Sequence, residues 1–385
     1  MTVVRAQAAA PVLKEAKRLR HVGIIRISTA RAVMDYLKLI GLIMLILLVI
    51  AWSIDLARYL PDVRAGAEAS DRSLALVLPT YLFFRTAEFV TKFFPIAVLF
   101  GVFLAEIWRR VNLESVVLVA SGMTLRQRAA PLLLLGLLTG LVQGSMETFL
   151  RPAAMMAHIE MGIGSPAGRF QPGLTGAVWF VSGDATVRAR VLRDNEPELR
   201  DALIFTGLRE AQFDAVYAAD RVVPTGTHLE WRLIGVERWE GGSGGGVSTP
   251  VPDLTLRLDL IPEQLRYLFL SEFYWPTRSL QRLTELREAY NVAAADLALW
   301  RRVTYWFLPG ALAFLAVGLA HRGFVGRRPM LPRLIALAVF GHMTVVSVRV
   351  LWAVGKHGLI PAPLAASATV GFALIVGFVL FRRGP

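Results

Sequence analysis

Long apolar runs occur toward both ends of the chain, with short basic segments between them. A helix of roughly 20 apolar residues is long enough to cross the hydrocarbon core of a bilayer. Residues 74–92 mix apolar and charged positions, so this segment either lies at the outer interface or extends the second helix. We interpret six runs as transmembrane helices, at about 35–57, 93–107, 129–149, 303–320, 334–354 and 360–381.

The pattern changes to short alternating runs between about residues 150 and 260. Gly, Pro, Asp and Asn separate these runs, and a Gly-rich tract at 241–246 fits a hairpin loop. Alternation with even spacing predicts an antiparallel sandwich or roll. The expected strands lie at 176–181, 186–192, 202–206, 213–223, 228–238 and 254–260.

An amphipathic helix is predicted between the strands and the fourth apolar run. Pro309-Gly310 predicts a kink in that run. Leu280, Leu283, Leu286 and Tyr290 recur at helical spacing. We therefore divide the chain into a basic N-terminal segment, three membrane helices, a β-rich domain, an amphipathic helix and three further membrane helices. The bounds of these parts are 1–34, 35–149, 150–275, 276–300 and 301–385.

The distribution of charge predicts how the helices are oriented in the membrane. The net charge is +13, and 17 of the 42 Lys and Arg residues lie in four segments that flank apolar runs. Cytoplasmic loops of membrane proteins carry such an excess of positive charge. Both termini are therefore expected in the cytoplasm, and residues 150–300 outside it. The four basic segments are 1–31, 107–128, 321–333 and 382–385.

Motifs for other functions are missing from the sequence. It contains no P-loop, no H-E-x-x-H and no G-x-S-x-G, so we expect neither catalytic nor metal-binding residues. The basic residues are not interleaved with aromatic ones, which argues against nucleic-acid binding. The first apolar run is too long for a signal peptide, and no small-residue cleavage site follows it. Cysteine is absent, so no disulfide framework forms.

Residues 109–128 carry signals for a short helix on the expected cytoplasmic face. Asn112 is a good N-cap, and Glu114 lies in the first turn, where the helix dipole favours an acid. Gly122 suits the left-handed conformation that ends many helices. The sequence therefore predicts a helix over about 113–121, between the second and third membrane helices.

A capping box of Thr124 and Gln127 then opens the third membrane helix. Ordinary loops seldom carry two sets of caps around an apolar helix, and such a helix fits a groove on a soluble partner. We predict that it docks on a cytoplasmic partner, and an ordinary intracellular loop is the alternative. The residues expected to take part are Asn112, Glu114, Ser115 and Gly122.

Charged residues near the outer ends of the membrane helices are the candidate ligand contacts, because charge inside a bilayer is costly and usually functional. The alternative for Arg58 is that it only snorkels to the interface. The alternative for Arg349 is an ion pair with Asp55 or Glu147. Four cations are expected toward the outer leaflet, where they suit an anionic lipid headgroup. These are Arg58, Arg85, Lys92 and Arg349.

Several short motifs resemble the LptF/LptG family, the membrane subunits of the transporter that extracts lipopolysaccharide from the inner membrane. The strongest are Phe93-Phe94-Pro95-Ile96, Asn112-Leu113-Glu114-Ser115 and Ala120-Ser121-Gly122-Met123-Thr124. Val178-Trp179-Phe180 resembles the opening strand of the family's periplasmic β-jellyroll. The resemblance covers nearly all of the chain after about residue 22. Ile54-Asp55 and the turn Gly358-Leu359-Ile360-Pro361 lean toward LptG rather than LptF.

The resemblance implies an α-helical membrane protein with six transmembrane helices and an inserted periplasmic β-jellyroll, in the inner membrane of a bacterial cell. It implies a permease subunit of an ABC transporter rather than an enzyme. The implied partners are an LptF-like permease subunit, a dimeric LptB-like ATPase, and LptA- and LptC-like jellyroll proteins of a periplasmic bridge. The chain itself would hold no cofactor, since ATP would be bound by the ATPase.

The resemblance also implies a path for the lipid. Lipopolysaccharide would enter between the first and fifth spans, and its acyl chains would pass up through the β-jellyroll. The alternatives are export of another anionic or isoprenoid lipid, a membrane-embedded enzyme acting on a lipid-linked substrate, and a structural assembly factor. ATPase activity that needs a separate nucleotide-binding subunit would distinguish transport from the last two.

Overall fold

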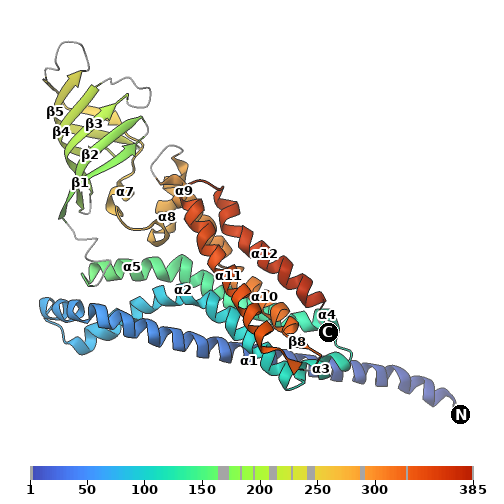
Figure 1. The fold of residues 1–385 in the computed structure, drawn as a ribbon. Helices are drawn as coiled ribbons and strands as arrows, with labels where there is room; N and C mark the ends of the chain where they lie inside the picture. Colours follow the sequence, from blue (N-terminus) through green and yellow to red (C-terminus); the bar gives the residue numbers. More distant parts are fainter. Residues whose placement is uncertain are drawn as a thin grey trace.

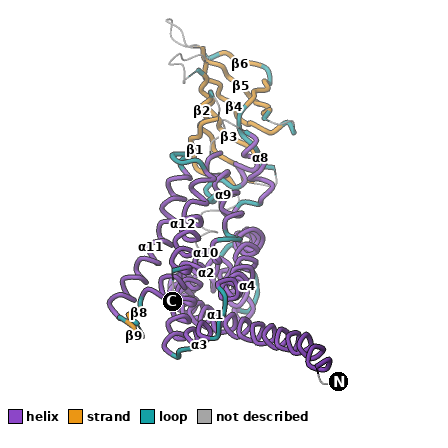
Figure 2. The backbone as a smooth tube through the Cα atoms, turned by 90° about the vertical axis from the view of Figure 1, so that its right-hand side faces the viewer, coloured by secondary structure: helices purple, strands orange, loops and turns teal. Residues whose placement is uncertain are grey.

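In the computed structural model, a bundle of long helices carries a β domain beyond one of its ends (Figure 1). Figure 2 shows the same order after a turn of 90°, with helix α3 and the hairpin of β8 (Phe324–Val325) and β9 (Arg328–Pro329) at the opposite end. Of residues 3–26, 115, 119 and 240 only the backbone is described. The structure describes residues 3–163, 173–182, 184–193, 196–207, 215–226, 229–240, 248–286, 291–326 and 328–383.

The N-terminal half of the bundle consists of three long helical segments, each extending beyond the apolar run that predicted it. The first reaches Ala69, because Val63 and Ala67 pack against Val77 and Tyr81 of the second helix. The second includes residues 74–92, so this segment extends the membrane helix. The elements are α1 (Val3–Ala69), α2 (Leu74–Val111), α3 (Glu114–Ala120), α4 (Leu125–Ser145), a π-helical turn (Met146–Leu150) and α5 (Arg151–Glu160).

The third segment does not end near Arg151-Pro152, as the sequence suggested, but continues to Glu160. Proline ends an α-helix because it lacks an N–H and its ring clashes with the carbonyl four residues earlier. Here a π-helical turn precedes Pro152, and the Arg151 N–H bonds the carbonyl of Met146, five residues back. The widened turn accommodates the ring, and Pro152 becomes part of the first turn of α5.

The C-terminal half supplies the remaining membrane helices. Five helices of the described chain are long and apolar enough to span a membrane, and α9 with α10 forms a sixth span bent by 59°. The break lies at residues 305–307, just before the predicted kink, and Pro309 is tolerated in the first turn of α10. The spans of this half are α9 (Val292–Thr304) with α10 (Leu308–Arg322), α11 (Leu331–Lys356) and α12 (Ala362–Arg382), and the short helix α8 (Thr277–Glu285) precedes them.

The single amphipathic helix predicted over 276–300 is wrong, since α8 and α9 are separate helices. Asn291 has a φ of 70° immediately before α9, and this left-handed residue interrupts the helical path. Tyr290, part of the predicted stripe, lies outside the described residues. Leu280 and Leu283 are fully buried, so the apolar face of α8 was predicted correctly.

The β domain is one antiparallel sheet in which successive strands are neighbours, in the order β1 to β6, with β7 also paired to β5. Gly235 has a φ of 68° between the stretches of β5 that pair with β7 and β6. A Cβ atom there would lie 2.4 Å from an oxygen of Asp220, so glycine is required. The strands are β1 (Gly173–Ser182), β2 (Ala185–Arg193), β3 (Glu198–Thr206), β4 (Ala215–Pro224), β5 (Glu230–Glu240), β6 (Thr249–Val251) and β7 (Leu254–Arg257).

The connection from β7 back to the bundle passes through α7 (Pro262–Arg266) and a 3-10 turn (Glu272–Tyr274) before it reaches α8. On the membrane side, α10 is the central helix and packs against α2, α4, α11 and α12. A stripe of Gly136, Gly140 and Gly144 on α4 faces the bend of the broken span. A Cβ atom on Gly140 would lie 2.2 Å from the carbonyl oxygen of Trp306, so the two backbones meet without room for side chains.

Candidate functional site

Helix α3 lies at the end of the bundle opposite the β domain, between α2 and α4 (Figure 1). As predicted, Glu114 lies in its first turn and Gly122 adopts a left-handed φ of 81° after it. The predicted capping box is also present. Thr124 N–H donates to Gln127 Oε1 at 2.8 Å, and Gln127 N–H donates to Thr124 Oγ1 at 3.4 Å.

The predicted role of Asn112 as an N-cap is wrong. Helix α2 continues to Val111, and the Asn112 N–H donates to the carbonyl of Trp108 at 3.0 Å, so Asn112 caps the C-terminus of α2. Basic residues in the last turn of α2 favour this longer helix through its dipole. Leu113, with a φ of 62°, then turns the chain into α3. The side chain of Ser115 lies outside the described residues.

Glu114 is half-buried and is held by two cations of its own chain. Its carboxylate lies 3.5 Å from Arg31 Nη2 on α1 and 3.6 Å from Arg109 Nε on α2. Arg31 is largely exposed, whereas Arg109 is buried. The first turn of α3 is therefore tied electrostatically to the two longest helices.

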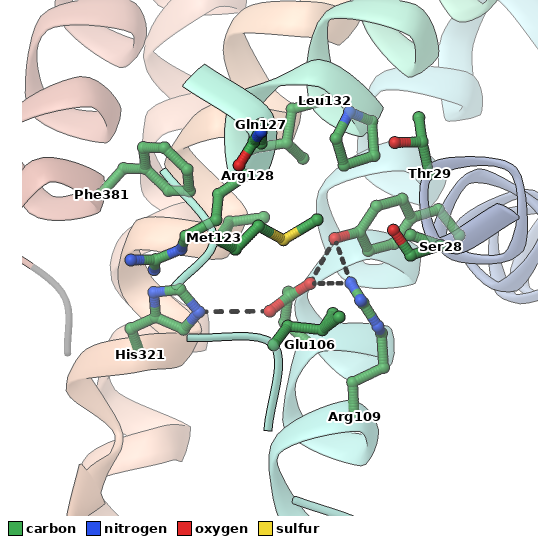
Figure 3. A pocket seen from close by; sticks show the side chains of 15 residues that line it. Ser28, Thr29, Glu106, Arg109, Met123, Gln127, Arg128, Leu132, His321 and Phe381 are labelled. Carbon is green, nitrogen blue, oxygen red and sulfur yellow. Dashed lines mark hydrogen bonds and ion pairs between the residues drawn. The ribbon is translucent and has the colours of Figure 1, made fainter. Parts of the chain in front are cut away.

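Behind Glu114 lies a buried cluster around Glu106, shown in Figure 3. Glu106 accepts hydrogen bonds from the Tyr36 hydroxyl and from Arg109 Nη1 at 2.9 Å, and lies 3.2 Å from His321 Nε2. Arg109 Nη1 also donates to the Tyr36 oxygen at 2.9 Å. A cavity of about 50 Å³, also lined by Ser28 and Gln127, adjoins these groups.

The Glu106 cluster joins α1, α2 and α10 at the level of α3. One local signal pointed to this cluster, the three-residue spacing of Glu106 and Arg109 on one helix. The contributions of Tyr36 and His321 come from distant segments and could not be found in that way. Among the described residues, no group of three or more His, Asp or Glu side chains is arranged to hold a metal ion.

The predicted headgroup cations fall into two pairs at the outer side. Arg85 donates to buried Asp55 through Nε at 2.9 Å and Nη2 at 2.7 Å. Glu88 pairs with both Arg85 and Lys92. Asp55 also accepts from the Tyr81 hydroxyl at 2.6 Å. Arg85 and Lys92 are therefore part of an ion-pair network between α1 and α2.

Arg58 and Arg349 are exposed, and unlike Arg85 and Lys92 they are not part of the ion-pair network. Arg349 Nη2 donates to the backbone carbonyl of Lys92 at 3.2 Å, and Arg58 lies over the ring of Tyr59. Within the described part of the chain, neither has an ion pair with an acid. The alternative that Arg349 pairs with Asp55 or Glu147 is wrong, because those acids are held by other arginines.

The membrane-length helices and the β domain between them define a multi-pass membrane protein. The sequence model of the family described as lipopolysaccharide export system permease LptF/LptG matches residues 32–383. The chain belongs to this family, and it is a multi-pass inner-membrane permease that works with other Lpt components. No curated protein matches the sequence. The leaning toward LptG stays a prediction.

Proposed function

We propose that the chain is an LptG-like subunit of an ABC transporter that extracts lipopolysaccharide from the inner membrane and passes it to a periplasmic bridge. The observation that carries this proposal is the apolar surface around α3, at the end of the bundle opposite the β domain. Both termini and α3 would then lie in the cytoplasm, as the basic flanking segments favour.

The α3 surface exposes apolar side chains at the end of a span, beyond the expected hydrocarbon region. Trp108 and Val117 are 69% and 63% exposed, and Val111, Leu113 and Val116 are also exposed around them. Contiguous exposed apolar side chains outside the bilayer mark a protein interface. We propose that this surface docks into a groove of a dimeric, LptB-like ATPase. The ATPase would bind the ATP, for which this chain has no binding motif.

The outer cations suit the phosphates of a lipid headgroup. Arg58 and Arg349 have no acidic partner in the described residues and are exposed, so we assign them the direct contacts. Arg85 and Lys92 are engaged by Asp55 and Glu88, and would shape the site around those contacts. Because α1 and α11 both pack on α2, a lipid reaching both arginines would enter beside α2.

The acyl chains have an apolar destination at the base of the β domain. A cavity of about 390 Å³ lies there, between β1 and the connection through α7. Ten of its fifteen lining residues are apolar, five of them aromatic, and Trp179 and Phe269 are about 60% exposed; we call it the aromatic cavity. Its aromatic lining residues are Trp179, Phe180, Tyr267, Phe269 and Trp275.

The edge of the sheet suits the next protein of the bridge. Strand β1 pairs only with β2 among the described strands, which leaves its other side open. Leu174, Trp179 and Val181 are exposed along it. An open edge with apolar side chains can pair with a strand of another chain, so this edge fits an LptA- or LptC-like jellyroll.

Reconstitution with the partner ATPase and an LptF-like subunit in proteoliposomes tests the proposal. We expect ATP hydrolysis to require all three subunits, and lipopolysaccharide to be released onto a bridge protein only when ATP is present. Lipid mass spectrometry of the purified complex identifies the substrate, and a different anionic or isoprenoid lipid would replace lipopolysaccharide in the proposal. If the ATPase hydrolysed ATP at the same rate with and without this chain, the result would contradict a permease role.

A further inference from the structure

The segment Glu272–Thr277, called the linker here, connects the β domain to the membrane helices. It begins with the 3-10 turn after α7 and ends at the first residue of α8. Cationic side chains from three other elements converge on these six residues. The proposed function uses none of these cations, although three of them are almost fully buried.

Two of the cations share one buried acid. Glu147 is 1% exposed, and it lies 2.9 Å from Arg151 Nη1 and 3.1 Å from Arg301 Nη2. The Arg151 guanidinium lies 4.5 Å from the ring centre of Tyr274, and that of Arg301 lies 4.2 Å from the ring centre of Phe273. Both arginines therefore hold aromatic rings of the linker by cation–π contact.

Two further cations bind the linker directly. Arg302 Nη2 donates to the Trp275 carbonyl at 2.5 Å, and its other terminal nitrogen donates to the Thr277 hydroxyl. Lys356, the last residue of α11, lies 3.1 Å from the buried carboxylate of Glu272. With these contacts, α5, α9 and α11 all hold the linker.

The burial of these groups is more than a passive connection requires. Three buried guanidinium groups face one another around Glu147, and a buried cation without its own acid is destabilising in a membrane protein. Such groups usually mark function. Arg301 and Arg302 lie on α9, directly before the 59° bend of the fourth span.

Movement of the bend in the fourth span would reach the linker through α9. Trp306, in the bend, packs against the glycine stripe of α4, where a Cβ atom on Gly144 would lie 2.3 Å from its ring. Because this contact leaves no free space, a shift of α4 against α10 must displace the bend and α9 with it. The linker moves with α9 through Arg301 and Arg302.

Movement of the linker would change the aromatic cavity under the β domain. Glu272 and Trp275 of the linker line this cavity, and so does Lys356. We propose that the linker transmits movement of the broken fourth span to the aromatic cavity, so that the Lys356–Glu272 pair controls the passage of lipid from the membrane into the β domain. This inference rests on the proposed function and adds a positioning role for residues outside the headgroup site.

Site-specific photocrosslinking separates the two steps of transfer. A photoreactive phenylalanine analogue at Ile54, exposed on α1, reports lipid in the membrane, and one at Trp179 reports lipid in the cavity. The probe is lipopolysaccharide in proteoliposomes containing the complete complex and ATP. With Lys356→Glu, which repels Glu272, we expect crosslinking at 54 to persist and crosslinking at 179 to fall about tenfold.

Two further variants make the result specific to the ion pair. Combining Lys356→Glu with Glu272→Lys restores an ion pair of reversed polarity, and we expect it to restore crosslinking at 179. The matched control is His357→Glu, which adds an acid at the neighbouring exposed position and should leave both crosslinks intact. If the Lys356→Glu variant fails to assemble, Lys356→Gln takes its place. We again expect crosslinking at 54 to persist and crosslinking at 179 to fall.

Unchanged crosslinking at 179 in an assembled Lys356 variant, or no rescue by the reversed pair, would overturn the linker proposal while leaving the proposed function intact. Equal losses at 54 and 179 would overturn it as well, because they would indicate a general structural role. Failure of the proposed function itself gives a different result, since the unaltered complex would then crosslink lipopolysaccharide at neither position.

Discussion

At the scale of single residues, the acids at the ends of the membrane helices are held by donors of the chain itself. Asp55 is bound by Tyr81 and Arg85 on the outer side. Glu106 is bound by Tyr36, Arg109 and His321 at the other end. Buried acids with several donors fix the relative positions of the helices that supply them. This pairing leaves the exposed arginines as the charges available to a ligand.

The Glu106 cluster should contribute measurably to stability. Glu106→Gln keeps the shape of the side chain but removes the buried acid next to His321, and it leaves buried Arg109 with only the more distant, half-buried Glu114. Breaking a buried ion pair from one side is strongly destabilising, so we expect a loss of about 3 kcal/mol in the free energy of unfolding. Denaturant unfolding in detergent measures it. Glu160→Gln, at an exposed acid on α5, is the control, and equal stability of the two variants would contradict a stabilising cluster.

The exposed arginines should determine affinity for the lipid. Replacing Arg58 and Arg349 by Gln removes two charge-assisted contacts to phosphate, and we expect lipopolysaccharide crosslinking to fall about tenfold for each arginine. Lipid-stimulated ATP hydrolysis should fall with it while the complex stays assembled. Arg333→Gln, exposed at the other end of α11, is the matched control. Dissociation of the complex would make the two arginines structural, and unchanged crosslinking would move the headgroup toward Arg85 and Lys92.

At the scale of elements, local signals predicted what local forces determine. The first-turn acid, the left-handed glycine and the capping box around α3 were predicted correctly, because each depends on residues within one turn. The alternating strands were predicted for the same reason. Asn112 was misassigned because only two residues, Asn112 and Leu113, separate α2 from α3. Asn112 caps the C-terminus of the longer helix, α2, instead of the N-terminus of α3.

Long-range packing explains the elements that the sequence did not predict. The length of α1 depends on contacts with α2, and the position of the bend depends on glycines of α4 that face Trp306. Their spacing of four residues, at 136, 140 and 144, was a signal in the sequence for close helix contact. The split of the predicted helix at 276–300 had no comparable signal, since Asn291 alone does not require a break.

The exposed face of α3 should be the docking element. Val117→Asp places a charge in the centre of the apolar surface without disturbing a buried contact. Because the charge would be buried in the interface, we expect affinity for the ATPase to fall at least about tenfold, by copurification or surface plasmon resonance. Val325→Asp, at a similarly exposed valine of the β8–β9 hairpin, should have little effect. Equal binding by both variants would place the interface elsewhere.

Glu114 should affect coupling through the partner and through its own chain. Glu114→Lys adds a cation beside Arg31 and Arg109, so it should weaken ATPase association while the protein still inserts in the membrane. Glu114→Gln removes the charge without this repulsion. If Glu114 contacts the ATPase, both variants should lose association. If only Glu114→Lys loses ATPase association, the effect comes from repulsion within the chain. Normal transport and normal ATPase association in both variants would contradict the docking role of Glu114.

At the scale of the whole molecule, the two charged clusters mark the limits of the membrane. Glu88 and Glu106 lie 18 positions apart on α2, which corresponds to about 27 Å at the rise of an α-helix. This separation is close to the thickness of the hydrocarbon core. The exposed surfaces of the helices between the clusters are apolar, as at Leu45 and Val49 of α1. The bilayer therefore lies between the Asp55 and Glu106 clusters, with α3 on one side and the β domain on the other.

This placement predicts the sidedness of the chain, which single cysteines can test because the natural sequence contains none. Thr255→Cys lies on an exposed position of β7, and Val325→Cys lies on the exposed β8–β9 hairpin. In right-side-out inner-membrane vesicles, an impermeant maleimide should label position 255 and not position 325. Inverted vesicles should give the opposite pattern. Labelling of 255 only in inverted vesicles would reverse the orientation, and would place the aromatic cavity on the side where no periplasmic bridge can receive a lipid.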